Sequence, residues 1–274
     1  RLLKEAEGNV ALRVEEAQDK DSFYVSGRGE LQLAVLIETM RREGFEFAVS
    51  RPRVVYKKGD NGERLEPIEE VVIDVDEIHS GAVVQKMSER KADLLELKPS
   101  GGDRVRLVFH APTRGLIGYQ SELMTDTKGT AIMNRLFHDY LPYKGDIAGR
   151  TQGVLISNDQ GVSVAFAMFN LEDRGPMIIG AGVKVYQGMI VGIHTRENDL
   201  EVNILKGKKL TNVRAAGKDE AVKLTTPQAM SLERALSWIQ DDELVEVTPQ
   251  TIRLRKVQLD PVDRKRTAKA KAEA

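Results

Sequence analysis

The chain of 274 residues contains no cysteine. Disulfide bonds, thiolate nucleophiles and zinc sites with cysteine ligands are therefore excluded, and this composition suits a cytosolic protein. The four histidines, His79, His110, His138 and His194, lie far apart in the sequence and lack the close spacing of metal-binding helices. We accordingly expect a cytoplasmic protein without a metal site.

Aromatic residues make up only 5% of the chain, and no apolar run approaches the roughly 18 to 20 residues needed to cross a bilayer. A membrane-spanning protein is therefore not expected. Hydrophobic residues still make up 41% of the chain, which suffices for ordinary cores. The chain starts at Arg1 without an initiator methionine and without a signal peptide, so we expect it to begin inside a longer protein.

Motifs of nucleotide sites and of serine hydrolases are also absent. The chain has no GxxxxGK[ST] phosphate loop and no GxSxG nucleophile elbow. Gly27 and Gly29 lie between a predicted strand and a predicted helix, where backbone N–H groups could hold a phosphate. Gln32 stands where a dinucleotide-binding motif has its third glycine, so a tight turn is the favoured interpretation.

Neighbouring carboxylates are the remaining candidates for acid–base catalysis. In a chain with 30% charged residues, such pairs arise by chance on solvated surfaces. None of them predicts an active site, and we expect no enzyme activity from this chain. The pairs considered are Glu69/Glu70, Asp74/Asp76 and Asp241/Asp242.

Residues 1–58 predict an incomplete ferredoxin-like domain. The end of a helix is followed by strands at 11–14 and 22–25, a helix at 30–43 and a strand at 45–49. This order is a βαββαβ unit that lacks its first strand. The helix at 30–43 carries an apolar stripe spaced i, i+3, i+4, i+7, formed by Leu33, Leu36, Ile37 and Met40.

Residues 59–147 predict a second ferredoxin-like βαββαβ domain. We expect the two domains to act together as a rigid spacer. The predicted elements of the second domain are a strand at 68–77, a helix at 81–90, strands at 91–97 and 104–111, a helix at 114–124 and a strand at 130–140.

Residues 148–274 predict a β-rich third domain, which makes the whole chain α+β. The runs GVLISN, VSVAFAMF and PMIIGAGVKVYQGMIVGIHT are typical of short strands joined by tight turns. A short helix is predicted at 231–239 and a hairpin at 243–256. The basic, alanine-rich tail from residue 260 onward is expected to be frayed.

Positive charge is concentrated in one segment of this third domain. Residues 206–223 contain six lysines and arginines against two carboxylates, although the chain as a whole has a net charge of −1. Such a segment can neutralise RNA phosphates, while small polar side chains bond to sugar and phosphate oxygens. A solvated loop with surplus lysine is the alternative. The candidate RNA-binding residues are Lys206, Lys208, Lys209, Asn212, Arg214 and Lys218, with His194 and Arg196 as possible extensions.

Four stretches resemble the BipA (TypA) family of translational GTPases related to elongation factor G. SGRGELQLAVLIETMRREGFEFAVSRPRVVYK is similar to domain III of that family, and PTRGLIGYQSELMTDTKGTAIMNRLFHDYLPYKG is similar to its domain V. GIHTRENDLEVNILKGKKLTNVRAAGKDEAVKL and DDELVEVTPQTIRLRK resemble its C-terminal domain. The similarity covers essentially the whole chain.

The resemblance implies a bacterial factor that acts in stress response, virulence regulation and 50S assembly. It implies binding to the ribosome (50S or 70S), with contacts to 23S ribosomal RNA and A-site tRNA through a basic loop that matches 199–218. GTP and Mg²⁺ would bind in a domain that precedes these residues, so no cofactor is expected here. We expect a monomer without membrane contact. A protein-binding scaffold without RNA affinity, or a hydrolase that uses paired carboxylates, remains an alternative.

Overall fold

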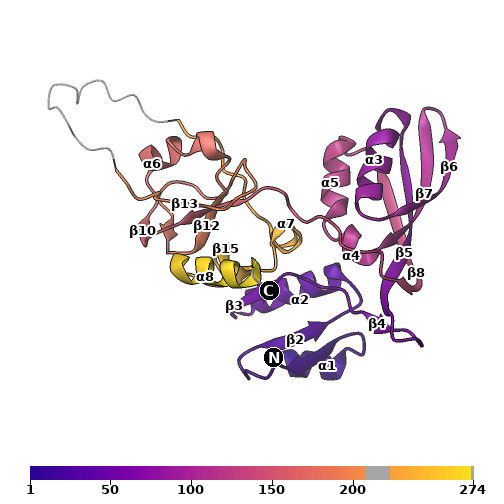
Figure 1. Ribbon diagram of the computed structural model, residues 1–274, viewed down its shortest axis with the longest axis horizontal. Helices are drawn as coiled ribbons and strands as arrows, with labels where there is room; N and C mark the ends of the chain where they lie inside the picture. Colours follow the sequence, from indigo (N-terminus) through magenta and orange to yellow (C-terminus); the bar gives the residue numbers. More distant parts are fainter. Residues whose placement is uncertain (208–222, 273–274) are drawn as a thin grey trace. The chain divides into compact units, whose positions relative to one another are not determined.

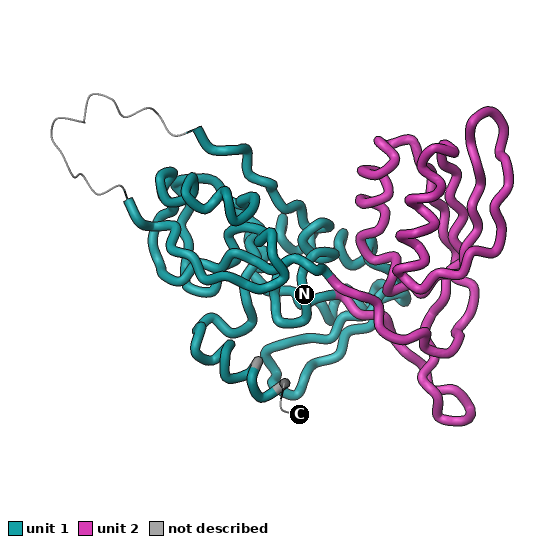
Figure 2. Tube along the Cα trace, turned by 45° about the horizontal axis from the view of Figure 1, so that its top comes forward, with its two compact units in different colours: residues 1–51, 150–274 teal, residues 52–149 magenta. Residues whose placement is uncertain are grey.

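The computed structural model describes residues 1–207 and 223–272, which fall into two compact units. Unit 1 combines the two ends of the chain, residues 1–51 and 150–274, and unit 2 is residues 52–149 (Figure 2). Among the described helices, none has the length and apolar character that a membrane span requires.

Unit 2 has the ferredoxin-like fold expected for its sequence. Its antiparallel strands lie in the order β8-β5-β7-β6, which is the order of a βαββαβ unit, and the short β4 extends one end of β5. The elements are β4 (Lys57–Lys58), β5 (Arg64–Asp76), α3 (Glu77–Glu89), β6 (Asp93–Gly101), β7 (Arg104–Pro112), α4 (Thr113–Leu116), α5 (Tyr119–Asp126) and β8 (Ile132–Pro142).

The core of unit 2 lies between its sheet and its helices. Alternate residues of β5 and β7 are buried, as the period of two in a strand requires, and α3 and α5 pack against them (Figure 1). Phe109 and Tyr119 are fully buried there. The predicted helix at 114–124 is divided into α4 and α5, because Gly118 takes a left-handed conformation with φ of +74°.

Unit 1 is assembled from the first and last parts of the chain. Its elements are α1 (Leu2–Gly8), β1 (Arg13–Glu16), β2 (Phe23–Ser26), α2 (Glu30–Arg42), β3 (Phe47–Ser50), β9 (Val154–Ser157), β10 (Gly161–Val162), α6 (Ala165–Phe169), the 3-10 helix η1 (Glu172–Arg174), β11 (Lys184–Val185), β12 (Met189–Ile193), β13 (Leu200–Val202), α7 (Leu232–Trp238), β14 (Glu243–Val247), β15 (Ile252–Lys256) and α8 (Pro261–Ala272).

The largest sheet of unit 1 joins segments that are far apart in the sequence. It has six strands in the order β13-β9-β12-β15-β14-β3, and β3 pairs antiparallel with β14. Strands β1 and β2 form a separate two-stranded sheet. Unit 1 therefore contains most of the first predicted domain and nearly all of the third. The division into three domains at 1–58, 59–147 and 148–274 stays a prediction.

Local signals locate most elements of unit 1, with two exceptions. The hydroxyl oxygen of Ser231 caps α7 by accepting a hydrogen bond from the backbone of Arg234, as the sequence indicates. The run VSVAFAMF is not a strand, because Ala165–Phe169 forms α6. The tail is likewise a helix and not frayed: the Asp260 carboxylate accepts the backbone N–H groups of Val262 and Asp263 at the start of α8.

Two histidines of unit 2 stack on each other. The rings of His110 on β7 and His138 on β8 lie 4.0 Å apart between their centroids. Burial and the neighbouring His138 lower the pKa of His110, and Lys144 adds to this effect, whereas Glu70 and Asp93 oppose it. In the folded chain His110 therefore binds its proton at a lower pH than in the unfolded chain.

We predict that unit 2 loses stability as the pH falls below about 6.5, because the unfolded chain then binds a proton that folded His110 resists. The His110→Gln variant should show a flatter pH profile. Hydrogen exchange of the β7 amides between about pH 7.5 and 5.5 measures the effect in unit 2 alone. His79→Gln is the control and should keep the native profile. An unchanged profile in His110→Gln would contradict the prediction.

Candidate RNA interface

The basic segment leaves unit 1 from a buried strand end. The backbone N–H of Asn158 donates to the carbonyl of Val202 at 3.1 Å, and the N–H of Val164 donates to that of Ile204 at 2.9 Å. Ile204 is fully buried, whereas Lys206 is exposed two residues later. The chain is therefore held up to Ile204, two residues before the basic segment begins.

The segment returns to unit 1 at a second fixed point. The backbone N–H and the hydroxyl of Thr225 both donate to the Glu172 carboxylate at 2.7 Å. The N–H of Gln228 donates to the carbonyl of Met177 at 2.8 Å. Both ends of the basic segment are thus attached to unit 1. The predicted residues Lys208, Lys209, Asn212, Arg214 and Lys218 lie outside the described residues.

A tight turn at 194–199 lies just before β13. Its backbone is held by Gly153, whose N–H donates to the carbonyl of Arg196 at 2.7 Å and whose carbonyl accepts from the N–H of His194 at 2.9 Å. A Cβ atom at residue 153 would lie 2.2 Å from the carbonyl oxygen of Asn198, so this approach requires glycine. The turn presents Arg196 to solvent.

His194 has a structural role in this turn. Its side chain is buried, and Nδ1 lies within hydrogen-bond distance of the carbonyl oxygen of Asn198. A buried imidazole that is bonded to the backbone of its own turn is not available to a ligand. Of the predicted residues that the structure describes, Lys206 and Arg196 are exposed and His194 is not.

Arg174 is an exposed cation that the sequence analysis missed. Thr195 donates from its N–H and its hydroxyl to the carbonyl of Arg174, at 2.9 and 3.1 Å, which places the backbone of Arg174 against the residue that precedes Arg196. Gly175 permits this contact, since it has a φ of +142° and a Cβ there would lie 2.0 Å from the carbonyl oxygen of Ile193. The LEDRG sequence carries the only local signal, a glycine directly after an arginine.

A buried ion network underlies the turn. Lys256 Nζ lies 2.6 Å from Asp199, 2.8 Å from Asp242 and 3.0 Å from Glu243, measured to one carboxylate oxygen of each. Glu243, which is also buried, binds Arg150 through both oxygens at 2.8 and 3.2 Å. The network therefore joins β15 and β14 to the last residue of the turn.

The protonation of Lys256 follows from these partners. Burial by itself lowers the pKa of a lysine, but the charge of Glu243 and the hydrogen bonds to Asp199 and Asp242 outweigh it, so that the pKa of Lys256 is raised. A raised pKa means that the ammonium stabilises the fold at neutral pH, and that this contribution is lost only as the pH rises through the raised value.

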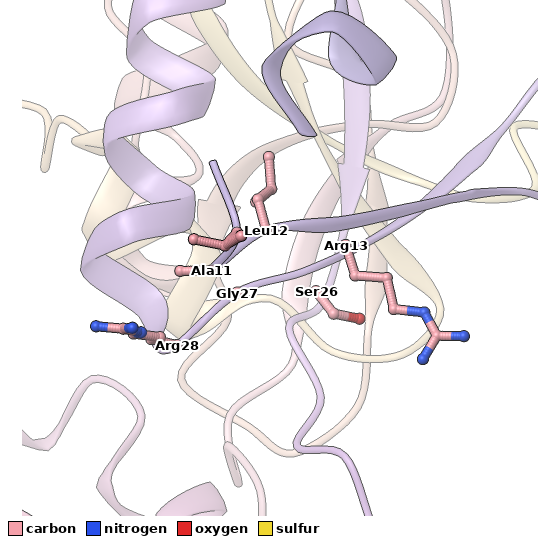
Figure 3. A pocket seen from close by; sticks show the side chains of 7 residues that line it. Ala11, Leu12, Arg13, Ser26, Gly27 and Arg28 are labelled. Atoms are coloured by element: carbon pink, nitrogen blue, oxygen red, sulfur yellow. The ribbon is translucent and has the colours of Figure 1, made fainter. Parts of the chain in front are cut away.

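The other candidate sites from the sequence are occupied by internal contacts. In the turn at Gly27, Gln32 Oε1 accepts the N–H of Arg28 at 2.8 Å, in accord with a tight turn rather than a phosphate site. This turn borders a shallow hollow in unit 1 (Figure 3). The hollow is lined by Val10, Ala11, Leu12, Arg13, Ser26, Gly27 and Arg28.

The neighbouring carboxylates that were considered as acid–base pairs are engaged with cations. Asp74 binds Arg106 through both oxygens at 2.8 Å, which lowers the pKa of Asp74. Within the described ranges 1–207 and 223–272, no group of three or more His, Asp or Glu side chains could hold a metal ion. The remaining ion pairs are Asp76–Arg104, Glu69–Arg135, Asp241–Arg51 and Asp242–Lys256, while Glu70 lies 3.9 Å from the imidazole of His110.

The chain matches two family models. Residues 63–151 match the elongation factor G C-terminus, and residues 152–261 match the TypA/BipA C-terminal domain. Over all 274 residues the chain is 56% identical to a Salmonella typhimurium protein named large ribosomal subunit assembly factor BipA. Residues 152–261 are therefore a TypA/BipA C-terminal domain. This confirms the resemblance read from the sequence.

Two further relatives carry the same name. The Escherichia coli K12 protein is 56% identical over 98% of this chain, and the Haemophilus influenzae protein is 54% identical over 97% of it. The chain spans 43% to 45% of the length of these three TypA/BipA relatives. The six-stranded sheet, the turn and the ion network lie mainly in the part that matches the TypA/BipA C-terminal domain.

We predict that Lys256→Met destabilises unit 1 by about 3–5 kcal/mol, because it leaves buried Glu243 and its neighbours without their shared cation. Trp238, the only tryptophan, lies under Arg150 in the same unit and reports unfolding in urea through its fluorescence. Lys206→Met removes an exposed lysine and should change the free energy of unfolding by less than about 0.5 kcal/mol. Equal losses in the two variants would disprove the role of the network.

Proposed function

We propose that this chain is the ribosome-binding part of a large-subunit assembly factor, which contacts RNA through the basic segment 206–223. The observation that carries the proposal is that a segment with a net charge of +4 is attached to unit 1 at both ends, near Ile204 and Thr225. The names of the relatives, which refer to assembly of the large ribosomal subunit, support the same partner. The proposed location is the cytoplasm, where ribosomes assemble.

The proposed binding mode depends on phosphate contacts. Lysines and arginines in the segment neutralise phosphates and release counterions, so the affinity falls steeply with salt. Arg174 and Arg196 add positive charge on fixed backbone, because close backbone contacts at Gly153 and Gly175 hold the turn and η1. Side chains on fixed backbone lose less conformational entropy on binding than those of an unanchored chain.

The finer assignments follow from the resemblance and belong to the same proposal. The RNA partners are 23S ribosomal RNA and the acceptor end of A-site tRNA. GTP hydrolysis with Mg²⁺ belongs to a domain of the longer protein that these 274 residues do not include. GTP would then bias the arrangement of the domains and hence the affinity for the ribosome, as in other nucleotide-dependent switches. The proposed oligomeric state is a monomer.

We predict that Lys208→Glu/Lys209→Glu weakens co-sedimentation with ribosomes and with separate 50S subunits across a salt series. The slope of log affinity against log salt should fall by about 1 for each lysine that contacts a phosphate. Lys4→Glu/Lys20→Glu is the matched control, since it makes the same charge change at two exposed lysines of unit 1 outside the basic segment. It should keep both affinity and slope.

Two outcomes would count against the proposal. If both double variants lose ribosome affinity equally, binding depends on the overall charge of the chain. If binding is saturable and neither double variant changes it, a protein scaffold without RNA affinity is favoured. Circular dichroism of each variant checks that it is folded, and the free energy of unfolding of Lys4→Glu/Lys20→Glu should change by less than about 0.5 kcal/mol because both lysines are exposed.

A further inference from the structure

The tip of the hairpin between β4 and β5 carries the only asparagine of the 274 residues that directly precedes a glycine. The two strands pair antiparallel through Lys57 and Lys58, and the chain turns between them at 59–63 (Figure 1). Asn61 and Gly62 are both exposed at this tip. In this arrangement the side-chain amide of the asparagine can react with the backbone nitrogen of the glycine.

Gly62 leaves the attacking nitrogen unshielded. The reaction joins the backbone nitrogen of Gly62 to Cγ of Asn61, and a side chain on the second residue would hinder this approach, whereas glycine has none. Apart from its chain neighbours, no heavy atom of the described residues lies within 4 Å of the position that a Cβ would take at Gly62, where φ is +84°. Neither a side chain of its own nor a packed segment therefore covers this side of Gly62.

Hydrogen bonds between neighbouring residues hold the tip. The N–H of Gly62 donates to the carbonyl of Gly59 at 3.0 Å, and the N–H of Gly59 donates to that of Glu63 at 2.8 Å. The Glu63 carboxylate also accepts the N–H of Asn61 at 3.0 Å. The first of these bonds must break before the nitrogen can attack. Among the described residues, the core cluster of unit 2 starts at Val71, so the tip can open locally while the core stays folded.

We infer that Asn61 is a site of spontaneous deamidation in the folded chain. The nitrogen of Gly62 gives up its proton and forms a bond to Cγ of Asn61. The bond between Cγ and Nδ2 breaks, and ammonia leaves with Nδ2 and, through the solvent, with that proton. Water then opens the five-membered succinimide ring. Hydrolysis of the new bond leaves an aspartate, and hydrolysis of the original peptide bond leaves an isoaspartate. Nothing is oxidised or reduced, and solvent water is the only co-reactant.

Both products change the tip. Each places a new carboxylate beside Asp60 and Glu63, so that three acidic groups stand within four residues. The isoaspartate also adds a methylene to the main chain, and the length of a hairpin loop sets the register of its strands. The bond between Gly59 and Glu63 and the pairing of β4 with β5 are therefore weakened. The modification requires neither RNA nor ribosomes, so it is independent of the proposed function.

The test follows the full chain in mildly alkaline buffer by mass spectrometry after digestion with trypsin. A sample digested before the incubation gives the starting value. Trypsin releases the hairpin tip as the peptide 59–64, because Lys58 and Arg64 flank it. The peptide 151–174 is the internal control, because its two exposed asparagines precede residues with a Cβ atom. These asparagines are Asn158 and Asn170.

The inference expects the mass increase of deamidation to accumulate in the peptide 59–64, divided between two isomers that chromatography separates, with the control peptide unchanged. Asn61→Gln should lose this increase, because a glutamine would have to close a larger and slower-forming ring. An increase that occurs in the chain unfolded in urea but not in the folded chain would overturn the inference, since the turn would then protect Asn61. Equal increases in the two peptides, or no increase in either, would overturn it as well.

Discussion

The buried contact between Lys256 and Glu243 is the constraint on which unit 1 depends. A buried lysine is tolerated only with partners at hydrogen-bond distance, and Lys256 has three carboxylates within 3.0 Å. Glu243 shares its charge between Lys256 and Arg150. These residues lie on β15, on β14 and, for Arg150, before β9, so the network joins these parts of unit 1. Through Asp199 it also fixes the turn that presents Arg196.

The turn at 194–199 and the two ends of the basic segment are held by the same part of unit 1. Gly153 and Gly175 let three stretches of backbone approach more closely than any side chain would permit. Their carbonyl and N–H groups satisfy one another, and these contacts hold the turn at 194–199 and η1 in place. Because both ends of the basic segment are fixed, less conformational entropy would be lost when the segment contacts a phosphate backbone.

Unit 2 has a core of its own and an exposed edge strand. Its core is closed by α3 and α5 on the sheet, and this leaves the edge strand β8 with exposed side chains. On that edge an irregularity in pairing, rather than a special loop, brings two aromatic rings together.

The sequence by itself determined the α+β class, helices α2 and α7, the hairpin of β14 and β15, and the positive segment, because periodicity, capping and charge are written in neighbouring residues. Tertiary structure alone decided that β3 pairs with β14, that His194 is buried, and that Lys256 lies among three carboxylates. It also decided that Lys57 lies over Tyr140. A local pattern shows which face of an element is apolar, but not which distant segment covers it. Contacts across tens to hundreds of residues exist only once the chain has folded.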